Sequence, residues 1–560
     1  MLPLVEIAVV LVLLLPLGLA RSFGLELLGA DGPLGMGLAV QAVVGLLLLG
    51  YLRGALAPRE RGMALGGYLL AFAGLGGAYL AGRSLWLPVC WEVSTLGFAL
   101  AFFSGGHRAR TVQSVVVLFA ASGVSMLLLA AWVFLPEGPT GLTCLALGLM
   151  LKGAFVGLHF WYAEVHAGAP NHVSAALSGA AVNLPVLLFA RYAAGSAEVA
   201  HHAAWLVPLA GVGVFLGGLV AFFKGDARRA LAHSTVENAN VLWLSLLASV
   251  FFSSVGQAEL ASGFRWVFYG VLVHHALSKT FQFLGLGYLY ELVGSSSVER
   301  CKGAGRGSGL SAGLLAAGAV SFAAMPGTVG FLAETSLLWM LGKSFGLPLA
   351  QALPVLAGLV FVLIGLVLGG SAHLRLYLPL ALSVPAQGVP AEVSPAPAGV
   401  RYALGAGAAA LFGLPVAVLV FLGLPASAGL PPVLRGWLLP AAAASAVIAV
   451  AWAALARWRF VHRVRARALW DCGNGYAGPE LSIPANVIST PLEAPLARYF
   501  LRDDGRARLD QKLHSAMARV LDLGRYWIGA VESGAVSTYL AFSTLVLMLT
   551  AGALVLFNLL

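Results

Sequence analysis

Three charged residues, Glu92, Lys152 and Lys279, stand inside long apolar stretches of this sequence. An ionisable side chain at the centre of a bilayer costs about 3 kcal/mol or more, so such residues usually mark a pathway for ions or protons. A lysine removed from water can exchange its proton, and Glu92 is a candidate ion partner for Lys152. The alternative for Glu92 is a simple hydrogen bond to a neighbouring helix.

Four more titratable residues extend this set. His275 and Lys279 are four residues apart in VLVHHALSKTFQF and so share one helix face, although His275 could also be a helix-packing histidine. Glu334 lies in MPGTVGFLAETSLL. His233 and Glu237, in ALAHSTVENANVLW, either join the pathway or lie half-exposed at the membrane edge. In chain order these acids and bases predict a lateral proton wire near the middle of the bilayer.

The composition predicts an all-α polytopic membrane protein. The 560 residues are 60% hydrophobic and 10% charged, with a mean hydropathy of +0.90. A spanning helix needs about 20 apolar residues, and by that rule the chain contains about 15 spans. The predicted spans are 3–20, 34–52, 64–82, 84–104, 112–135, 140–167, 171–191, 204–223, 229–252, 265–291, 308–344, 350–378, 400–424, 434–457 and 536–559.

Several classes of function are disfavoured by what the sequence contains. The net charge of +10 comes from short basic loops, which indicates topology rather than nucleic-acid binding. Its four cysteines form no C-x-x-C pair, which argues against an iron–sulfur or zinc site. There is no G-x-x-x-x-G-K-S/T loop for ATP and no nucleophile–base set for hydrolysis. We therefore expect no cofactor and no metal. Residues 3–20 read as a first span rather than a signal peptide.

Two predicted spans are too long for one straight helix. The span 140–167 carries Gly153 and Gly157 near its middle, and the span 308–344 carries Pro326-Gly327. We predict that each is a single discontinuous helix, because unwound backbone at membrane depth is tolerated where it lines a cavity.

Basic loop residues predict the orientation. They cluster after spans 2, 4, 8, 10 and 14, all on one side, which the positive-inside rule makes cytoplasmic. These residues are Arg53, Arg59, Arg61, His107, Arg108, Arg110, Lys224, Arg228, Arg229, Arg300, Lys302, Arg306, Arg459, Arg463, Arg465 and Arg467. The amino terminus is then inside and the carboxyl terminus outside.

The order of the spans predicts two inverted five-helix repeats, each with a discontinuous fourth member. They occupy residues 64–200 and 201–384, after amino-terminal helices in 1–63. Residues 385–457 hold a Pro/Ala linker and additional helices, 458–535 a cytoplasmic polar segment, and 536–560 a last helix. The polar segment could dock a sister subunit or a soluble redox arm, or could be a solvated connector.

Four motifs resemble the antiporter-like proton-channel family, which includes membrane-arm subunits of respiratory complex I and cation/proton antiporter subunits. The motifs are KGAFVGLHFW, AGAPNHVSAALSG, DARRALAHSTVEN and HHALSKTFQFLG, within about residues 91–338. The resemblance implies that Glu92 and Lys152 form an ion pair, that His275 and Lys279 continue a hydrophilic axis, and that Glu334 is its terminal charge. The glutamate of STVEN and Trp470-Asp471-Cys472-Gly473 look like hydrogenase-4 component B and formate hydrogenlyase subunit 3.

Two positions depart from the family pattern. Asn183 stands where the family usually has a lysine, and an amide cannot carry a charge. A water could bridge there, or this chain could conduct poorly. Gly157 replaces the family's proline after the first break, which allows a more flexible backbone.

The resemblance implies a proton-translocating membrane subunit of a complex I-like, hydrogenase- or formate-linked assembly, in a prokaryotic inner (plasma) membrane. Its expected partners are other membrane subunits and a soluble redox module. The chain itself would hold no redox centre and move protons, with sodium as an open possibility. The alternatives are a subunit of a sodium(cation)/proton antiporter and a non-conducting structural subunit.

Overall fold

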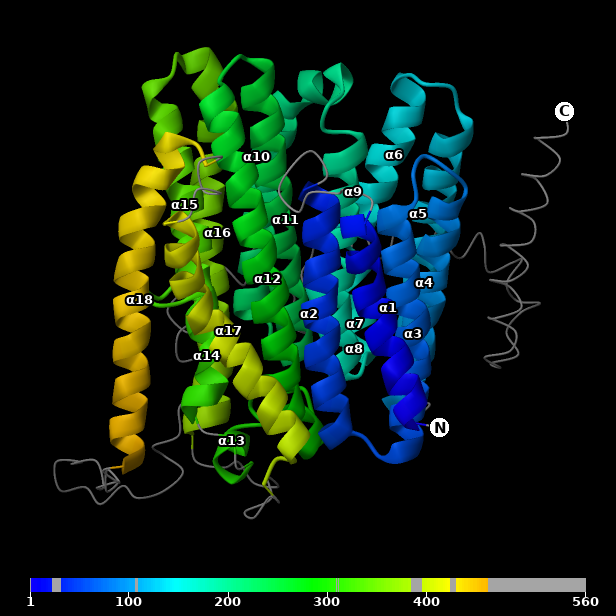
Figure 1. The fold of residues 1–560 in the computed structure, drawn as a ribbon, viewed down its shortest axis with the longest axis vertical. Helices are drawn as coiled ribbons and strands as arrows, with labels where there is room; N and C mark the ends of the chain where they lie inside the picture. Colours follow the sequence, from blue (N-terminus) through cyan, green and yellow to red (C-terminus); the bar gives the residue numbers. More distant parts are fainter. Residues whose placement is uncertain are drawn as a thin grey trace, which may run out of the picture.

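The protein is a bundle of long helices that stand side by side (Figure 1). The computed structural model describes residues 2–22, 32–105, 109–308, 310, 312–383, 395–423 and 430–461. Within these ranges the regular structure is helical, and the only β-type pairing is a single bridge between Asp226 and Ser297. The predicted all-α class is thereby confirmed.

The helices follow the order of the predicted apolar stretches. The amino-terminal half contains α1 (Leu2–Ser22), α2 (Gly32–Ala55), α3 (Pro58–Leu80), α4 (Trp86–Phe102), α5 (Ala109–Phe134), α6 (Pro139–Lys152), α7 (Tyr162–Gly168), α8 (Asn171–Ala176), α9 (Asn183–Tyr192) and α10 (Ala197–Phe223). The second half contains α11 (Ala227–Ser254), α12 (Ala258–Val293), α13 (Ala304–Gly307), α14 (Ala312–Phe322), α15 (Val329–Lys343), α16 (Leu349–Leu382), α17 (Ala398–Leu422) and α18 (Pro432–Val461).

Ten of the described helical segments are long and apolar enough to cross a membrane, so this is a multi-pass membrane protein. The count of about fifteen spans remains a prediction, as do the domain boundaries. The polar segment 458–535, almost in full, and the last predicted helix, 536–559, lie outside the described residues, together with Trp470-Asp471-Cys472-Gly473.

Local sequence explains where several helices begin and end. Asp226 accepts the backbone N–H of Arg229 at 3.0 Å and so caps α11, and Ser196 caps α10 in the same way. Thr328 accepts the N–H of Phe331 and starts α15. Gly294, with φ at 68°, ends α12 in a left-handed turn that glycine adopts without strain.

Two interruptions in the helices share one backbone pattern. The chain leaves helical geometry between Lys152 and Tyr162, and again between Phe322 and Val329. In each gap an alanine has positive φ (Ala154 at 52°, Ala324 at 47°), and a glycine three residues later does too (Gly157 at 83°, Gly327 at 99°). A left-handed alanine costs about 1–2 kcal/mol, so its surroundings must hold it. The pattern supports the predicted pair of broken helices, while the inverted repeat itself stays a prediction.

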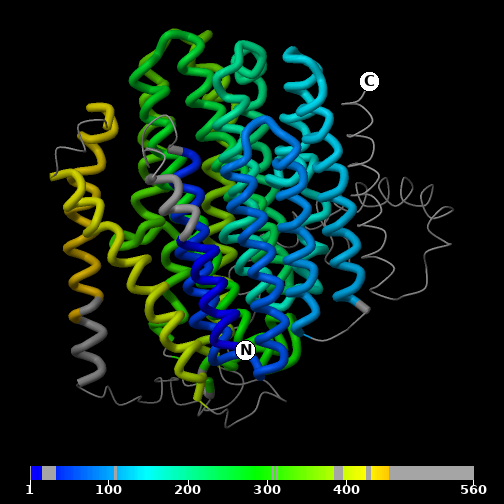
Figure 2. The backbone as a smooth tube through the Cα atoms, turned by 45° about the vertical axis from the view of Figure 1, so that its right-hand side comes forward, coloured from blue at the N-terminus to red at the C-terminus, as the bar shows by residue number. Residues whose placement is uncertain are grey.

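The turns that carry two of the basic clusters meet at one end of the bundle. The turn between α10 and α11 bonds to the segment after α12: Ala227 donates its N–H to the Ser296 carbonyl at 2.8 Å, and Val298 donates to the Gly225 carbonyl at 3.1 Å. This end of the bundle is the lower end in Figures 1 and 2. The proximity agrees with a single basic side, although the orientation in a bilayer remains a prediction.

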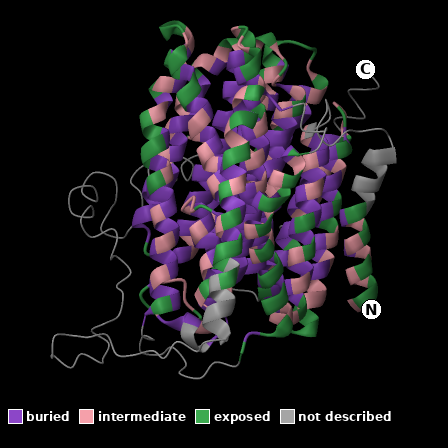
Figure 3. Ribbon diagram, turned by 60° about the vertical axis from the view of Figure 1, so that its left-hand side comes forward, coloured by how far each residue is buried: buried purple, intermediate pink, exposed green. Residues whose placement is uncertain are grey.

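α11 is the central helix. The apolar window of α11 is 100% buried, against 22% for α17 and 28% for α18. Figure 3 shows buried residues in the interior of the bundle and exposed residues on the outward sides of its helices. α11 packs against α10, α12, α16 and the short helix α7. Polar residues on α11 therefore face protein on every side, and burial without partners would cost several kcal/mol each.

Candidate functional site

The first group of buried charged residues lies between α4 and the end of α6. Glu92 and Lys152 interact electrostatically, but they are not among the direct ion pairs, within 4.0 Å, of the described residues. The Lys152 ammonium lies 5.5 Å from the Trp161 ring centre and 6.0 Å from that of Trp91, at cation–π range. A cavity of about 20 Å³ beside Lys152 has room for about one water.

The backbone of the first break is held by side chains of α11. Asn240 accepts the N–H of Val156 at 3.0 Å and donates to the Ala154 carbonyl at 3.0 Å. Trp243 donates its indole N–H to the Gly153 carbonyl at 2.9 Å. Backbone groups inside a membrane need partners, so these two residues make the unwound segment tolerable and fix Lys152 at its edge.

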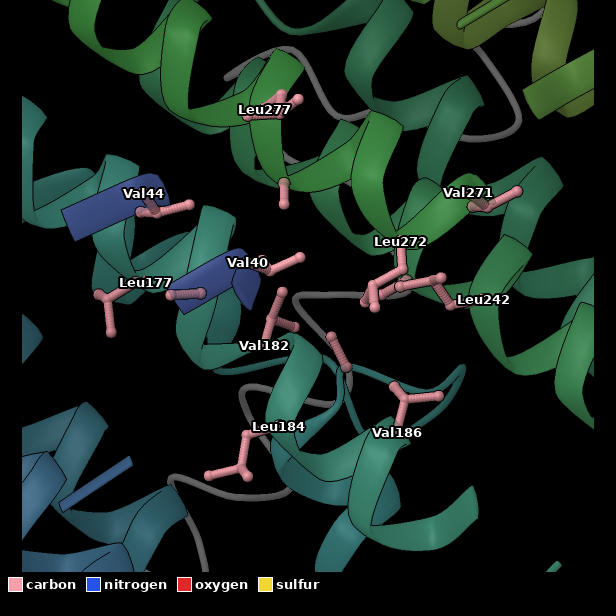
Figure 4. Packing of buried hydrophobic residues seen from close by; sticks show 14 of the residues in the cluster. Val40, Val44, Leu177, Val182, Leu184, Val186, Leu242, Val271, Leu272 and Leu277 are labelled. Atoms are coloured by element: carbon pink, nitrogen blue, oxygen red, sulfur yellow. The ribbon is translucent and has the colours of Figure 1, made fainter. Parts of the chain in front are cut away.

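A π turn at Leu177–Ala181 precedes α9. It is followed by Asn183, whose side-chain oxygen lies 3.2 Å from Nδ1 of His275, while its amide donates to the Gly179 carbonyl at 2.8 Å. Figure 4 shows buried apolar side chains of the core, among them Val182 and Leu184, which flank Asn183 in the sequence. Asn183 thus touches His275 directly, where the sequence suggested a bridging water or a broken link.

The second group centres on Lys279. Its ammonium donates to the Ser234 hydroxyl at 2.7 Å and to the Leu231 carbonyl at 3.3 Å, and it lies 3.4 Å from Nε2 of His373. Ser234 also bonds His373 Nε2 at 2.6 Å and donates to Glu237 at 3.2 Å. Glu237 and Lys279 attract each other electrostatically. Helices α11, α12 and α16 therefore meet at one buried polar cluster.

Glu334 belongs to the neighbouring contact set. Its carboxylate lies 3.8 Å from Nε2 of His274, and Nδ1 of His274 lies 3.2 Å from the Ser278 hydroxyl. The ring of Phe322 lies between this histidine and His373, with ring centres 4.9 Å and 4.0 Å away. Phe322 occupies the place before the second break that Lys152 occupies before the first, two residues ahead of the left-handed alanine. The Phe322 ring thus contacts both His274, the neighbour of Glu334, and His373 of the Lys279 cluster, while Glu334 also interacts electrostatically with Glu237.

The predicted residues lie in or near these two groups, with one correction. Glu92 and Lys152 form the first, and Glu237 and Lys279 belong to the second, with Glu334 nearby. His275 contacts Asn183, and His233 is buried on α11. The expectation that His233 and Glu237 could be half-exposed is wrong, since they are only 2% and 3% exposed. The reason is that α11 is enclosed on all sides instead of lying at the membrane edge.

Four important residues were missed by the sequence reasoning: Ser234, Asn240, Phe322 and His373. Ser234 and Asn240 lie in the ALAHSTVENANVLW stretch that drew attention for its charges. His373, in the middle of the apolar run of α16, carried the same signal as Glu92 and could have been found by it. Phe322 carried no signal, because an apolar residue in a membrane helix is ordinary.

The arrangement suits proton movement. A hydroxyl, an imidazole and a carboxylate lie close together beside the Lys279 amine, linked through Ser234, and each can take up or release a proton. Among the described residues no group of three or more His, Cys, Asp or Glu side chains could hold a metal ion. Lys152 makes no direct hydrogen bond to the Lys279 cluster in the described part of the chain, and Asn183 contacts His275 on α12.

Comparison with known proteins agrees with the motifs. Residues 112–359 match the family described as NADH:quinone oxidoreductase/Mrp antiporter, transmembrane. Over these residues the chain is similar to the antiporter-like family. The matched segment contains both helix breaks and every member of the predicted site except Glu92.

Relatives of this family are subunits of larger complexes by name. NADH-quinone oxidoreductase subunit N of Geotalea uraniireducens (strain Rf4) is 28% identical over 270 residues, covering 46% of this chain and 54% of that protein. Formate hydrogenlyase subunit 3 of Escherichia coli (strain K12) is 30% identical over 202 residues, covering 36% of this chain and 32% of that protein. The chain thus spans about half or less of these relatives.

The fold is also shared with a solved structure. A chain of the Mrp complex from Dietzia sp. DQ12-45-1b superposes with a TM-score of 0.55 at 19% identity, covering 74% of this chain and 85% of that one. At this identity the likeness concerns the fold alone. It shows that the helical bundle described above shares its fold with that chain.

Proposed function

We propose that this chain is the proton-translocating membrane subunit of a complex I-like assembly, linked to a hydrogenase or formate dehydrogenase module in a prokaryotic plasma membrane. The observation that carries the proposal is the buried polar cluster in which Lys279, His373 and Glu237 each lie within hydrogen-bond range of the Ser234 hydroxyl. Four such groups in a bilayer-spanning core are too costly to serve packing alone.

The path would start at Glu92 and Lys152 and reach His275 through Asn183. From His275 it continues to Lys279, one helical turn away on the same face, and then to the cluster at Ser234. Glu334 lies behind Phe322 and would receive the proton last. The relatives named as NADH-quinone oxidoreductase and formate hydrogenlyase subunits support an assembly in which electron transfer elsewhere drives these charge changes.

Two measurements test this function together. The tagged chain is purified in mild detergent, and the proteins that come with it are identified by mass spectrometry. A nickel–iron hydrogenase or formate dehydrogenase subunit supports the assembly and names the electron donor. Recovery of antiporter-type subunits alone, or of none, contradicts it.

The second measurement separates pumping from electron transfer in vesicles that contain the assembly. Lys152→Ala should abolish proton pumping and leave electron transfer intact, because the chain would hold charges and no redox centre. Lys343→Ala is the matched control, since Lys343 is an exposed lysine at the end of α15 and should change neither rate. Unchanged pumping in Lys152→Ala would refute the role of Lys152.

A cation/proton antiporter subunit is the second candidate, because the matching family covers both kinds of protein. Sodium dependence of proton movement in vesicles would favour this candidate. A proton current that is the same with and without sodium would exclude it.

A further inference from the structure

The Ser234 hydroxyl has three polar partners but only one hydrogen to donate. Its oxygen lies 2.7 Å from Nζ of Lys279, 2.6 Å from Nε2 of His373 and 3.2 Å from a carboxylate oxygen of Glu237. A serine hydroxyl offers one hydrogen and two acceptor lone pairs, and a lysine ammonium can only donate. Ser234 therefore accepts from Lys279, and its single hydrogen goes to one of the other two partners.

Two arrangements then satisfy all three contacts. In the first, Glu237 is protonated and donates to Ser234, and Ser234 donates to a bare Nε2 of His373. In the second, Nε2 of His373 carries the hydrogen and donates to Ser234, which donates to the Glu237 carboxylate. Only one of the two residues holds the exchangeable proton in each arrangement.

We propose that the Ser234 hydroxyl passes a proton between Glu237 on α11 and His373 on α16, which makes His373 a relay residue of this pathway. This inference rests on the proposed proton-translocating function. The Glu237 O–H bond breaks as its proton joins the Ser234 oxygen, and the original hydroxyl proton moves to Nε2 of His373. The products are a carboxylate and a proton-bearing Nε2, with the serine hydroxyl restored and pointing the opposite way.

The surroundings hold both ends of this exchange in place. A Cβ at Gly369 of α16 would collide with the carboxylate of Glu237, so the glycine gives that carboxylate its space. The His373 ring stacks on the ring of Phe322 with centres 4.0 Å apart and planes at 10°. The stacked ring keeps His373 in place, and the small Ser234 hydroxyl can reverse without any movement of a helix.

The second nitrogen of His373 provides the continuation. Nδ1 is buried and has no hydrogen-bond partner in the part of the chain that the structure describes. A buried polar atom without a partner costs free energy, so its presence calls for an explanation such as a functional role. Nδ1 is thus the atom through which the proton enters or leaves α16, on a route separate from His274 and Glu334.

A matched pair of variants tests the relay. Ser234→Thr and Ser234→Val introduce side chains of nearly the same shape, of which only threonine has a hydroxyl group. The full chain and its co-purifying subunits are placed in proteoliposomes with an internal pH dye, and proton flux is driven by a potassium diffusion potential. We expect Ser234→Thr to conduct and both Ser234→Val and His373→Gln to lose about a hundredfold, the lower range for a positioned proton-transfer group. Equal flux in the threonine and valine variants overturns the proposal.

A second readout separates this inference from the proposed function. Lys279→Met in the same liposomes reports on the function: if it conducts like the unaltered chain, the proposed function fails. The relay is read independently by NMR of ring-¹⁵N-labelled histidine, with the His373 signal assigned by its loss in His373→Gln. The Nε2 resonance should shift in Ser234→Val and stay in place in Ser234→Thr. An unshifted resonance in the valine variant refutes the hydroxyl link even where flux is lost.

Discussion

Replacing Asn240 by alanine tests how the first helix break is kept open. The change removes the acceptor of the Val156 N–H and the donor to the Ala154 carbonyl, both at 3.0 Å. A buried group left without a partner costs about 1–3 kcal/mol, and interhelical hydrogen bonds in membranes average about 0.6 kcal/mol. Two such groups give a range of about 1.2–6 kcal/mol, and we expect a loss of about 3 kcal/mol in the free energy of unfolding.

Asn238→Ala is the matched control, because Asn238 is also buried on α11 and donates to the Ser234 carbonyl of its own helix. Its loss should cost less than about 1 kcal/mol, since no other helix loses a partner. Unfolding in mixed detergent micelles, followed by tryptophan fluorescence, measures both variants. If the two lose the same stability within about 0.5 kcal/mol, our account of the break is refuted.

Gly369→Ala should lower the free energy of unfolding by about 1–3 kcal/mol and reduce proton flux, because the added methyl group overlaps the carboxylate of Glu237. Detergent unfolding measures the first effect and flux in liposomes the second. A variant with unchanged stability and flux contradicts the packing described. Asn183→Leu should reduce proton flux in liposomes about two- to tenfold, because it removes the hydrogen bond to His275. If Asn183→Lys instead raises the flux, the native chain conducts poorly at this position. Burial and a neighbouring aspartate raise the pKa of the Cys301 thiol to about 12, so the thiol stays protonated and unreactive at pH 8. Iodoacetamide labelling followed by peptide mass spectrometry should show modification of Cys301 only after unfolding. Labelling of the folded protein as fast as the unfolded protein would contradict this prediction.

The sequence allowed prediction of the family, the helical class and the positions of both breaks. Hydrophobic stretches fix where helices can lie in a bilayer, since backbone groups there must be satisfied within the helix. The glycines at 157 and 327 marked the interruptions, and both adopt positive φ. The charged candidate residues could also be identified from the sequence, because each interrupts an otherwise apolar stretch.

Contacts between distant helices could not be predicted in this way. Ser234 and His373 are 139 residues apart in sequence and 2.6 Å apart in the structure, and Asn240 reaches a carbonyl 86 residues away. Serine and asparagine are common in membrane helices and carry no charge to draw attention. Their roles depend on which helix packs against α11.

The sequence by itself therefore determined which residues are present and where helices can form: a multi-pass helical chain that resembles the antiporter-like family, with buried acids and bases and two helix breaks. Only the tertiary structure decided which of these residues contact one another across different helices. The packing of helices around α11 brings Ser234, Lys279 and His373 together and places Asn240 on the first break, and the Phe322 ring contacts both His274 and His373. Periodicity within one helix says which residues share a face, whereas helix packing alone says which faces meet.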